Sequence, residues 1–317
     1  MIVKKDSNSD NNSLLPEDYL RKDYLEKIRK YEIFRHEANN VREKDKKIIR
    51  DFFKSFGRGG DIKVGVGFQR AYGSILSGDH FDLFKLTDKI FLFIFADMSG
   101  HGLPAYTTLI KLRSAIILAV KENESILKST GLVNYSSIVR NIAVKFIDIM
   151  DLSDSNDFAA VNFVFVENQS DCLKFRFYNR SMLFPIVIRR HKDQIITFNL
   201  NNQYDIWQPN KGYLLSNNIK NLVNDESYYD TPESCFDIYQ GDMIFFYSDG
   251  ITEAFDSEDE DKQYGEERLV QKLVESSDLP PQLVINNIFD SVYEFIGKHE
   301  HQIDDMTAVL IDLPALW

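Results

Sequence analysis

The chain has 317 residues, of which 44% are hydrophobic, and it carries a net charge of −12. This composition excludes wholesale disorder, because a large core can be buried, and the surplus of carboxylates argues against nucleic acid as a partner. Residues 1–54 carry 14 basic and 11 acidic side chains (+3), whereas residues 55–317 carry 23 and 38 (−15). The acidic excess is either a solvated surface or a supply of oxygen ligands for cations, and only the positions of the carboxylates separate the two.

Residues 1–15, beginning MIVKKDSNSDNN, are predicted to be disordered. They lack the apolar core of a signal peptide, and no segment approaches 18 consecutive apolar residues. We therefore expect a cytoplasmic protein that is neither secreted nor inserted in a membrane.

Residues 16–56 are predicted to form one long helix, because no Gly or further Pro interrupts them until the glycine-rich break that begins at Gly57. A heptad frame leaves only Lys27 and Asp45 polar in its two seam positions. The seam consists of Leu20, Tyr24, Lys27, Tyr31, Phe34, Ala38, Val41, Asp45, Ile48 and Phe52. This stripe must be buried either against a second copy, in a homodimeric coiled coil, or against the rest of its own chain, and the sequence leaves both open.

Residues 57–317 are predicted to form one α+β domain. Short β-rich runs occupy residues 64–72, 81–86, 90–96, 158–166, 172–178, 184–190, 195–199 and 243–248, with a last strand in AVLIDL. Helical spacing of apolar residues covers 103–123, 136–150, 266–276 and 281–298. This clustering favours a layered α+β domain over a parallel βαβ sheet. Cys172 and Cys235, the only cysteines, lack the spacing of a zinc site and are predicted to be buried, reduced thiols.

Two carboxylates directly follow strongly apolar strands. IFLFIFAD ends in Asp97 and DMIFFYSD ends in Asp249, and each is followed within a few residues by glycine. A carboxylate at the lip of an apolar core is costly unless it is paired or bound to a metal. Glycine at such a turn allows the main chain to approach a ligand closely.

Two further acidic turns are SGDHFD, with Asp79 and Asp82, and DDMT, with Asp304 and Asp305. Each motif alone is structural in most proteins, where it forms an Asx turn or a cap. Their combination and order are far more specific. The chain resembles the SpoIIE/RsbU-like branch of the PPM phosphatases through SGDHFD, ADMSGHGLPA, QGDMIFFYSDGITEAFD, YGEERL and DDMTAVLI, between about residues 48 and 313.

The resemblance implies a fold and an activity. The fold is a β-sandwich of two antiparallel sheets flanked by helices, with carboxylates that converge at one end on two divalent metals. The activity is hydrolysis of phosphoserine or phosphothreonine by direct attack of an activated water, without a phosphoenzyme intermediate.

The resemblance also implies a role for each residue that matches a motif. Asp97 would bridge the two metals and the main-chain carbonyl of Met98 would bind one of them, while Asp249 and Asp304 would bind the other. Asp79 would act mostly through metal-bound water. Asp305 is either a further ligand or a cap of the turn, whereas Asp82 and Asp242 are expected to make turn and hydrogen-bonding contacts.

The ligand chemistry agrees with this implication, because carboxylates, a carbonyl and water suit Mg²⁺ or Mn²⁺, whereas zinc and copper sites recruit His or Cys. His101 would contact the phosphate or a metal-bound water, or would hold its loop by a hydrogen bond. Many relatives have Ala-Gly-His in mid-domain where this chain has Asn179-Arg180-Ser181. Arg180 is therefore a candidate substrate contact, with a surface arginine that solvates a turn as the alternative.

The resemblance suggests an anti-anti-sigma-factor (STAS-type) phosphoprotein as substrate, in a partner-switching pathway. The first alternative is a catalytically silent scaffold that binds the phosphoprotein. The second is a hydrolase of small phosphoesters or nucleic acid, and the acidic body disfavours nucleic acid. The polar residues 201–235 are expected to form a flap or a partner surface.

Overall fold

The computed structural model describes residues 43–44, 46–53, 62–152, 156–169, 171–191, 194–197, 211–223, 225–256, 259, 262–297 and 301–313. The chain forms two compact units, Met1–Glu43 and Lys44–Trp317, and the named strands and helices all lie in the second. The predicted disordered segment 1–15 and the heptad seam before Ile48 lie outside the described residues. The predicted domain boundaries therefore stay predictions.

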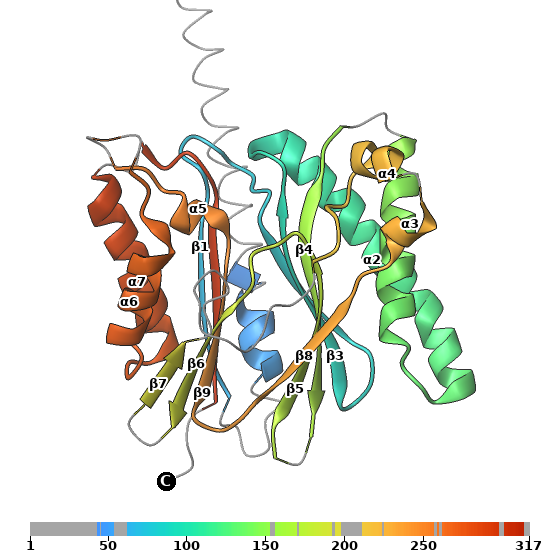
Figure 1. Ribbon diagram of the computed structural model, residues 1–317, viewed down its shortest axis with the longest axis horizontal. Helices are drawn as coiled ribbons and strands as arrows, with labels where there is room; N and C mark the ends of the chain where they lie inside the picture. Colours follow the sequence, from blue (N-terminus) through green and yellow to red (C-terminus); the bar gives the residue numbers. More distant parts are fainter. Residues whose placement is uncertain are drawn as a thin grey trace, which may run out of the picture. The chain divides into compact units, whose positions relative to one another are not determined.

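Two antiparallel five-stranded sheets form the body of the second unit (Figure 1). The first contains, in spatial order, β1 (Lys63–Gln69), β10 (Met306–Asp312), β9 (Asp242–Tyr247), β6 (Ile186–His191) and β7 (Gln194–Thr197). The second contains β2 (His80–Lys85), β3 (Ile90–Met98), β4 (Ala159–Asn168), β5 (Leu173–Arg180) and β8 (Glu233–Ile238). The predicted sandwich is confirmed.

Helices cover the outer face of each sheet, as Figure 1 shows. α2 (Gly102–Thr130) and α3 (Tyr135–Asp151) pack on the second sheet, and α6 (Gly265–Glu275) and α7 (Pro281–Ile296) pack on the first. Short helices α4 (Asn217–Val223), η1 (Glu226–Tyr229) and α5 (Asp249–Thr252) complete the described elements. α2 is long and apolar enough to cross a membrane by length and composition, and its packing against α3 and the sheet accounts for that composition.

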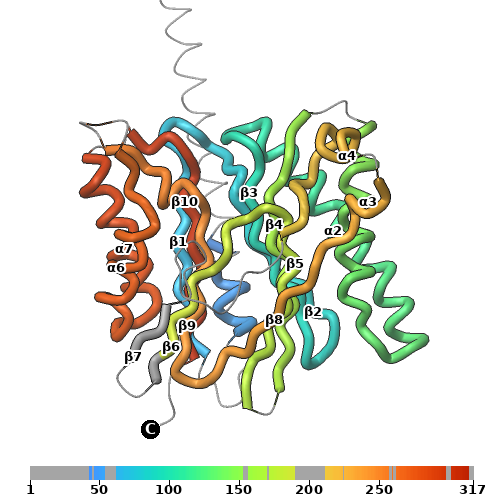
Figure 2. Tube along the Cα trace, in the orientation of Figure 1, coloured from blue at the N-terminus to red at the C-terminus, as the bar shows by residue number. Residues whose placement is uncertain are grey.

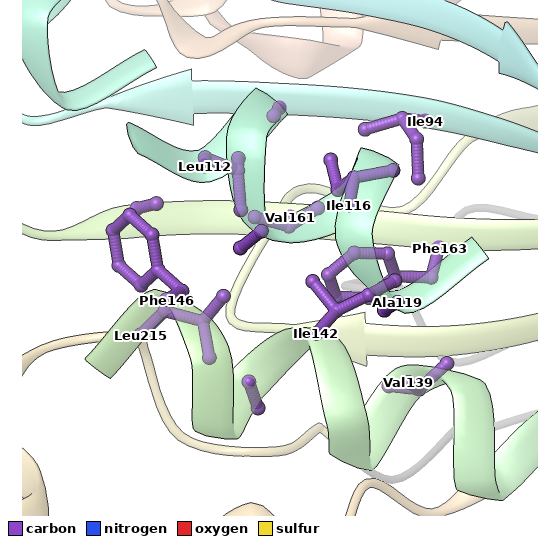
Figure 3. Close-up of a cluster of buried hydrophobic side chains, with 14 of the residues drawn as sticks. Ile94, Leu112, Ile116, Ala119, Val139, Ile142, Phe146, Val161, Phe163 and Leu215 are labelled. Atoms are coloured by element: carbon purple, nitrogen blue, oxygen red, sulfur yellow. The ribbon is translucent and has the colours of Figure 1, made fainter. Parts of the chain in front are cut away.

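The strands are almost continuously apolar because both faces of each sheet are covered. In β3, Phe91, Phe93 and Phe95 point into the core between the sheets, whereas Leu92 and Ile94 pack against the helices. Figure 3 shows the helix side of this arrangement, where residues of α2 and α3 meet residues of β3 and β4. A strand of this kind delivers its last residues to the end of the sandwich.

The helical residues 46–53 pack into the core between the sheets (Figure 2). Ile49 is 2% exposed and Phe53 is fully buried, with its ring 5.4 Å from that of Phe91. The end of the predicted N-terminal helix therefore packs on its own chain. Ile48, a residue of the predicted seam, is 57% exposed and leaves that side of the helix open to another contact.

The cysteine prediction is half wrong. Both thiols are free, but Cys235 is exposed and Cys172 is only half-buried. Cys235 lies on β8, which pairs with β5 and forms the edge of its sheet among the described strands. An edge strand with one solvated face exposes alternate residues, which the local composition around Cys235 did not indicate.

Candidate metal centre

Four carboxylates from separate parts of the chain lie at one end of the sandwich. Asp97 is the penultimate residue of β3, and Asp79 immediately precedes the antiparallel β2. Asp249 follows β9 after one residue, and Asp304 precedes the antiparallel β10. The end of one antiparallel strand lies beside the start of its neighbour, so each sheet contributes two of these carboxylates at the same end.

Asp79 is held by the turn that carries Asp249. Its Oδ2 accepts a hydrogen bond of 2.7 Å from the hydroxyl of Ser248, which in turn accepts one of 2.9 Å from the backbone N–H of Thr307. Burial raises the pKa of Asp79 well above its usual value, and the charge of Asp305 raises it further. Ser248 joins both sheets at this point, and nothing local in the sequence indicated that role.

Asp97 is a carboxylate on which three others act. Burial raises the pKa of Asp97 well above its usual value, and the charges of Asp79, Asp249 and Asp304 raise it further. A hydrogen bond with the Asp249 carboxyl acts in the same direction. Burial also raises the pKa of Asp304, to about 6. The site is therefore one in which several negative charges are crowded and incompletely solvated.

Asp305 makes hydrogen bonds that fasten loops together. Its Oδ1 accepts a hydrogen bond of 2.9 Å from the backbone N–H of Ala71, and its Oδ2 accepts one of 2.8 Å from the backbone N–H of Gly78. It thereby joins the segment that follows β1 to the segment that precedes β2. These bonds favour the structural alternative for Asp305 over direct ligation of a metal.

Glycines allow the loops of the site to touch. A Cβ at Gly250 would lie 2.1 Å from the carbonyl oxygen of Asp305, and a Cβ at Gly78 would lie 3.0 Å from the carbonyl oxygen of Met98. Side chains at either position would force the backbone segments apart. The closeness of Asp249 to the Asp304 loop thus depends on Gly250.

The residues fit divalent cations in charge and in donor type. Cations would relieve the mutual repulsion that raises the pKa of Asp97, and an all-oxygen donor set suits Mn²⁺ or Mg²⁺. As the side chains stand, however, no three His, Cys, Asp or Glu residues within the described ranges are arranged to hold an ion. Binding would therefore require these carboxylates to reorient.

The two predicted substrate contacts have different positions. His101 is exposed at the start of α2, within hydrogen-bonding distance of the Ser74 hydroxyl (3.1 Å), and it interacts electrostatically with Asp304. Arg180 is fully buried at the end of β5. The structure corrects both expectations for Arg180, because a side chain with no exposed surface neither contacts a substrate nor solvates a turn.

Asp82 and Asp242 make the structural contacts expected of them. Asp82 accepts a hydrogen bond from Arg113 at 2.9 Å, and Asp242 accepts one from the N–H of Tyr239 at 3.0 Å. Neither belongs to the group of carboxylates that act on Asp97.

Comparison with known proteins agrees with this architecture. Residues 222–314 match the family model described as stage II sporulation protein E (SpoIIE). A search of curated protein sequences gives no match. Among solved structures, the SiaA PP2C domain of Pseudomonas aeruginosa is similar with a TM-score of 0.60 at 13% identity, over 91% of this chain and 98% of that one.

Two further structures share the fold. The PP2C phosphatase domain of SpoIIE from Bacillus subtilis, with a fragment of its regulatory domain, has a TM-score of 0.56 at 16% identity, over 79% of this chain and 63% of that one. The RsbU and RsbW domains of Rv1364c from Mycobacterium tuberculosis have a TM-score of 0.52 at 15% identity, over 81% and 61%. This chain thus spans less than two thirds of each of these two. Residues 222–314 thus match the SpoIIE family model, and the described body of the chain has the fold of the PP2C-type phosphatase domains.

Proposed function

We propose that the chain is a cytoplasmic, metal-dependent phosphatase that hydrolyses phosphoserine or phosphothreonine on a regulatory protein. The observation that carries the proposal is that strands of both sheets bring Asp79, Asp97, Asp249 and Asp304 to the same end of the sandwich. Carboxylates that repel one another at the end of an apolar sandwich contribute nothing to stability by themselves. Bound cations would offset this repulsion and explain why the carboxylates lie together.

In this proposal two Mn²⁺ or Mg²⁺ ions are held by Asp97, the Met98 carbonyl, Asp249 and Asp304, with Asp79 acting through water. When bound, such a pair lowers the pKa of a water and offsets the charge of the phosphoryl group.

The chain's own residues would orient the reactants. Ser248 fixes the Asp79 carboxylate by its 2.7 Å hydrogen bond. His101, exposed beside Asp304, would contact the phosphoryl group from the rim. Asp305 would keep the loops in place through its bonds to the N–H groups of Ala71 and Gly78.

A silent scaffold of the same fold is the alternative. Binding of a phosphoprotein alone does not require mutually repelling carboxylates at the base of the site, and this favours an enzyme. The substrate suggested by the sequence motifs is a STAS-type phosphoprotein. A small phosphoester is the competing substrate, and the two differ in how far they would extend beyond the carboxylates.

Removal of divalent metal tests the reaction. EDTA should silence hydrolysis of a phosphorylated STAS-type protein and of p-nitrophenyl phosphate, and Mn²⁺ or Mg²⁺ should restore both, because the donor set contains only oxygen. The measurement is phosphate release from the stripped protein during titration with each ion. Rescue by Zn²⁺ alone would contradict the assignment of the ligands.

We also propose a homodimer formed through the predicted seam of residues 16–56. Ile48 lies on the exposed side of a helix whose Ile49 and Phe53 are buried, so a second helix can approach it. Phe34→Asp and Ile48→Asp in the full chain should each weaken association without touching a carboxylate of the site. A truncation near Gly57 is a poorer test, because it would remove Ile49 and Phe53 from the core. A full-length protein that sediments as a monomer at high concentration would refute the dimer.

A further inference from the structure

β5 ends in a buried arginine, Arg180, at the turn that leads out of the strand, and its environment is unusual. The guanidinium of Arg180 makes no salt bridge within the described part of the chain, and its Nε and Nη2 have no hydrogen-bond partner there. Its Nη1 donates to the carbonyl oxygen of Tyr228 at 2.7 Å, and the guanidinium lies 4.9 Å from the centre of the Tyr228 ring. Burial lowers the pKa of Arg180. The planar guanidinium can stack on the Tyr228 ring and donate hydrogen bonds at the same time, whereas the ammonium group of a lysine cannot.

The backbone of the same turn receives a distant segment. Ser181 has φ of +58°, the one positive value for a residue other than glycine in the described ranges. Its hydroxyl donates to the Gly212 carbonyl at 3.0 Å, and the Gly212 N–H donates to the Asn179 carbonyl at 2.7 Å. A Cβ at Gly212 would lie 3.0 Å from Cδ of Arg180. The turn Asn179-Arg180-Ser181 is thus shaped to hold the segment 211–216 against the sheet.

Tyr228 continues this connection. Its hydroxyl donates to the Leu214 carbonyl at 2.7 Å and accepts from the Ser216 N–H at 2.8 Å. Leu215, between them, is fully buried in the cluster drawn in Figure 3. Arg180 holds Tyr228, and Tyr228 holds the segment.

The segment lies near the candidate metal centre. Leu215 pairs with Ala159 through two hydrogen bonds of 3.0 Å, and Ala159 is the partner of Met98 across the strands. Two strand spacings, about 10 Å, therefore separate the backbone of Leu215 from that of Met98.

Two exposed aromatic side chains lie close to the paired residues Leu215 and Ala159 in the sequence. Tyr213 is 54% exposed, and its ring stacks on that of Tyr228 with centroids 6.3 Å apart and an interplanar angle of 16°. Phe158, 39% exposed, precedes Ala159 and is fixed by a hydrogen bond from its N–H to the Ser99 hydroxyl (3.1 Å). Aromatic side chains are enriched among the residues that contribute most at protein interfaces.

We propose that Tyr213 and Phe158 contact a phosphoprotein substrate beside the metal centre, and that Arg180 is the positioning residue for Tyr213. The inference rests on the proposed phosphatase function and adds to it the surface that the phosphoprotein would contact. A protein partner buries about 800 Å² on each side, a patch of about 16 Å radius. Centred on Met98, such a patch reaches beyond the backbone of Leu215, about 10 Å away, toward Tyr213 two residues before it. A small phosphoester bound at the carboxylates would not extend that far.

The test compares two substrates on the full-length protein: a phosphorylated STAS-type protein and p-nitrophenyl phosphate. Tyr213→Ala and Phe158→Ala should each raise KM for the phosphoprotein about tenfold, the effect of a strong interface residue, and should change hydrolysis of p-nitrophenyl phosphate less than twofold. Tyr213→Phe, which keeps the ring, should recover most of the loss. Arg180→Lys should resemble Tyr213→Ala, because the ammonium group cannot stack and donate in the same way.

Leu132→Ala is the matched control. Leu132 is 73% exposed and follows the far end of the 29-residue α2, about 43 Å along the helix axis from Gly102. The Leu132→Ala variant should hydrolyse both substrates as the wild type does. If the Tyr213 or Arg180 variants lost hydrolysis of both substrates equally, the effect would be merely structural and the proposal would be overturned. An unchanged KM for the phosphoprotein would also overturn it, as would a wild type that hydrolyses p-nitrophenyl phosphate but not the phosphoprotein. Failure to hydrolyse either substrate would instead refute the proposed function on which it rests.

Discussion

Replacement of Asp97 or Asp249 by Asn is expected to abolish Mn²⁺-dependent hydrolysis while leaving the fold intact. An amide keeps the shape of the side chain but not the charge that attracts the cations. The loss should exceed the ~10–100-fold decrease that is typical when a residue outside the ligand set of a metal is removed.

The stability of the same variants separates this account from a structural one. Without metal, Asp97→Asn should unfold no more easily than the wild type, because it removes a charge that Asp79, Asp249 and Asp304 oppose. With saturating Mn²⁺ the wild type should gain stability by binding, and the variant should gain little. Denaturant unfolding with and without Mn²⁺ measures both. Near-normal turnover by either variant would refute the proposed ligands.

The second large effect is expected from Gly250→Ala. The added methyl would lie 2.1 Å from the Asp305 carbonyl oxygen. Because that oxygen belongs to the backbone, no side chain can rotate away to relieve the clash. The overpacking should lower the free energy of unfolding by about 1–3 kcal/mol. The Mn²⁺-dependent rate per folded molecule should also fall, since relief of the clash moves Asp249 away from Asp304.

A stability-matched glycine provides the control for Gly250. Gly131 ends α2 with φ of +70°, and a Cβ added there would meet open space, so Gly131→Ala introduces backbone strain but no clash. It should cost about 1–2 kcal/mol and leave the Mn²⁺-dependent rate per folded molecule unchanged. If Gly250→Ala had no more effect on that rate than Gly131→Ala, the packing of the two loops would not matter for catalysis.

The elements that could be predicted from the sequence are those whose pattern is set by burial on both faces. The apolar run of β3 and the helical spacing in α2 and α3 are examples, and both were confirmed within a few residues at their starts. β8 was missed because it is an edge strand in a polar stretch, with exposed and half-buried residues in alternation. α2 continues to Thr130 through a charged stretch that carries no apolar period, and it ends where Gly131 adopts a left-handed conformation.

Strand ends in the sequence singled out Asp97 and Asp249, and the family resemblance implied that Asp79 and Asp304 converge with them at one end of the sandwich. Contacts between distant segments could not be predicted in that way. The hydrogen bond between Ser248 and Asp79 crosses from one sheet to the other. The polar neighbours of Arg180 indicate a surface residue, yet Arg180 is buried against Tyr228, which lies in a region without a recognisable pattern.

The number of Mn²⁺ ions bound per chain tests the central claim most directly. Equilibrium dialysis of the stripped protein against Mn²⁺ should give two ions for the wild type, and Asp97→Asn should lose the pair because its carboxylate would serve both ions. Restoration of phosphate release should follow the occupancy of these sites. Retention of both ions by Asp97→Asn, or a wild type that binds none at concentrations that support hydrolysis, would contradict the account.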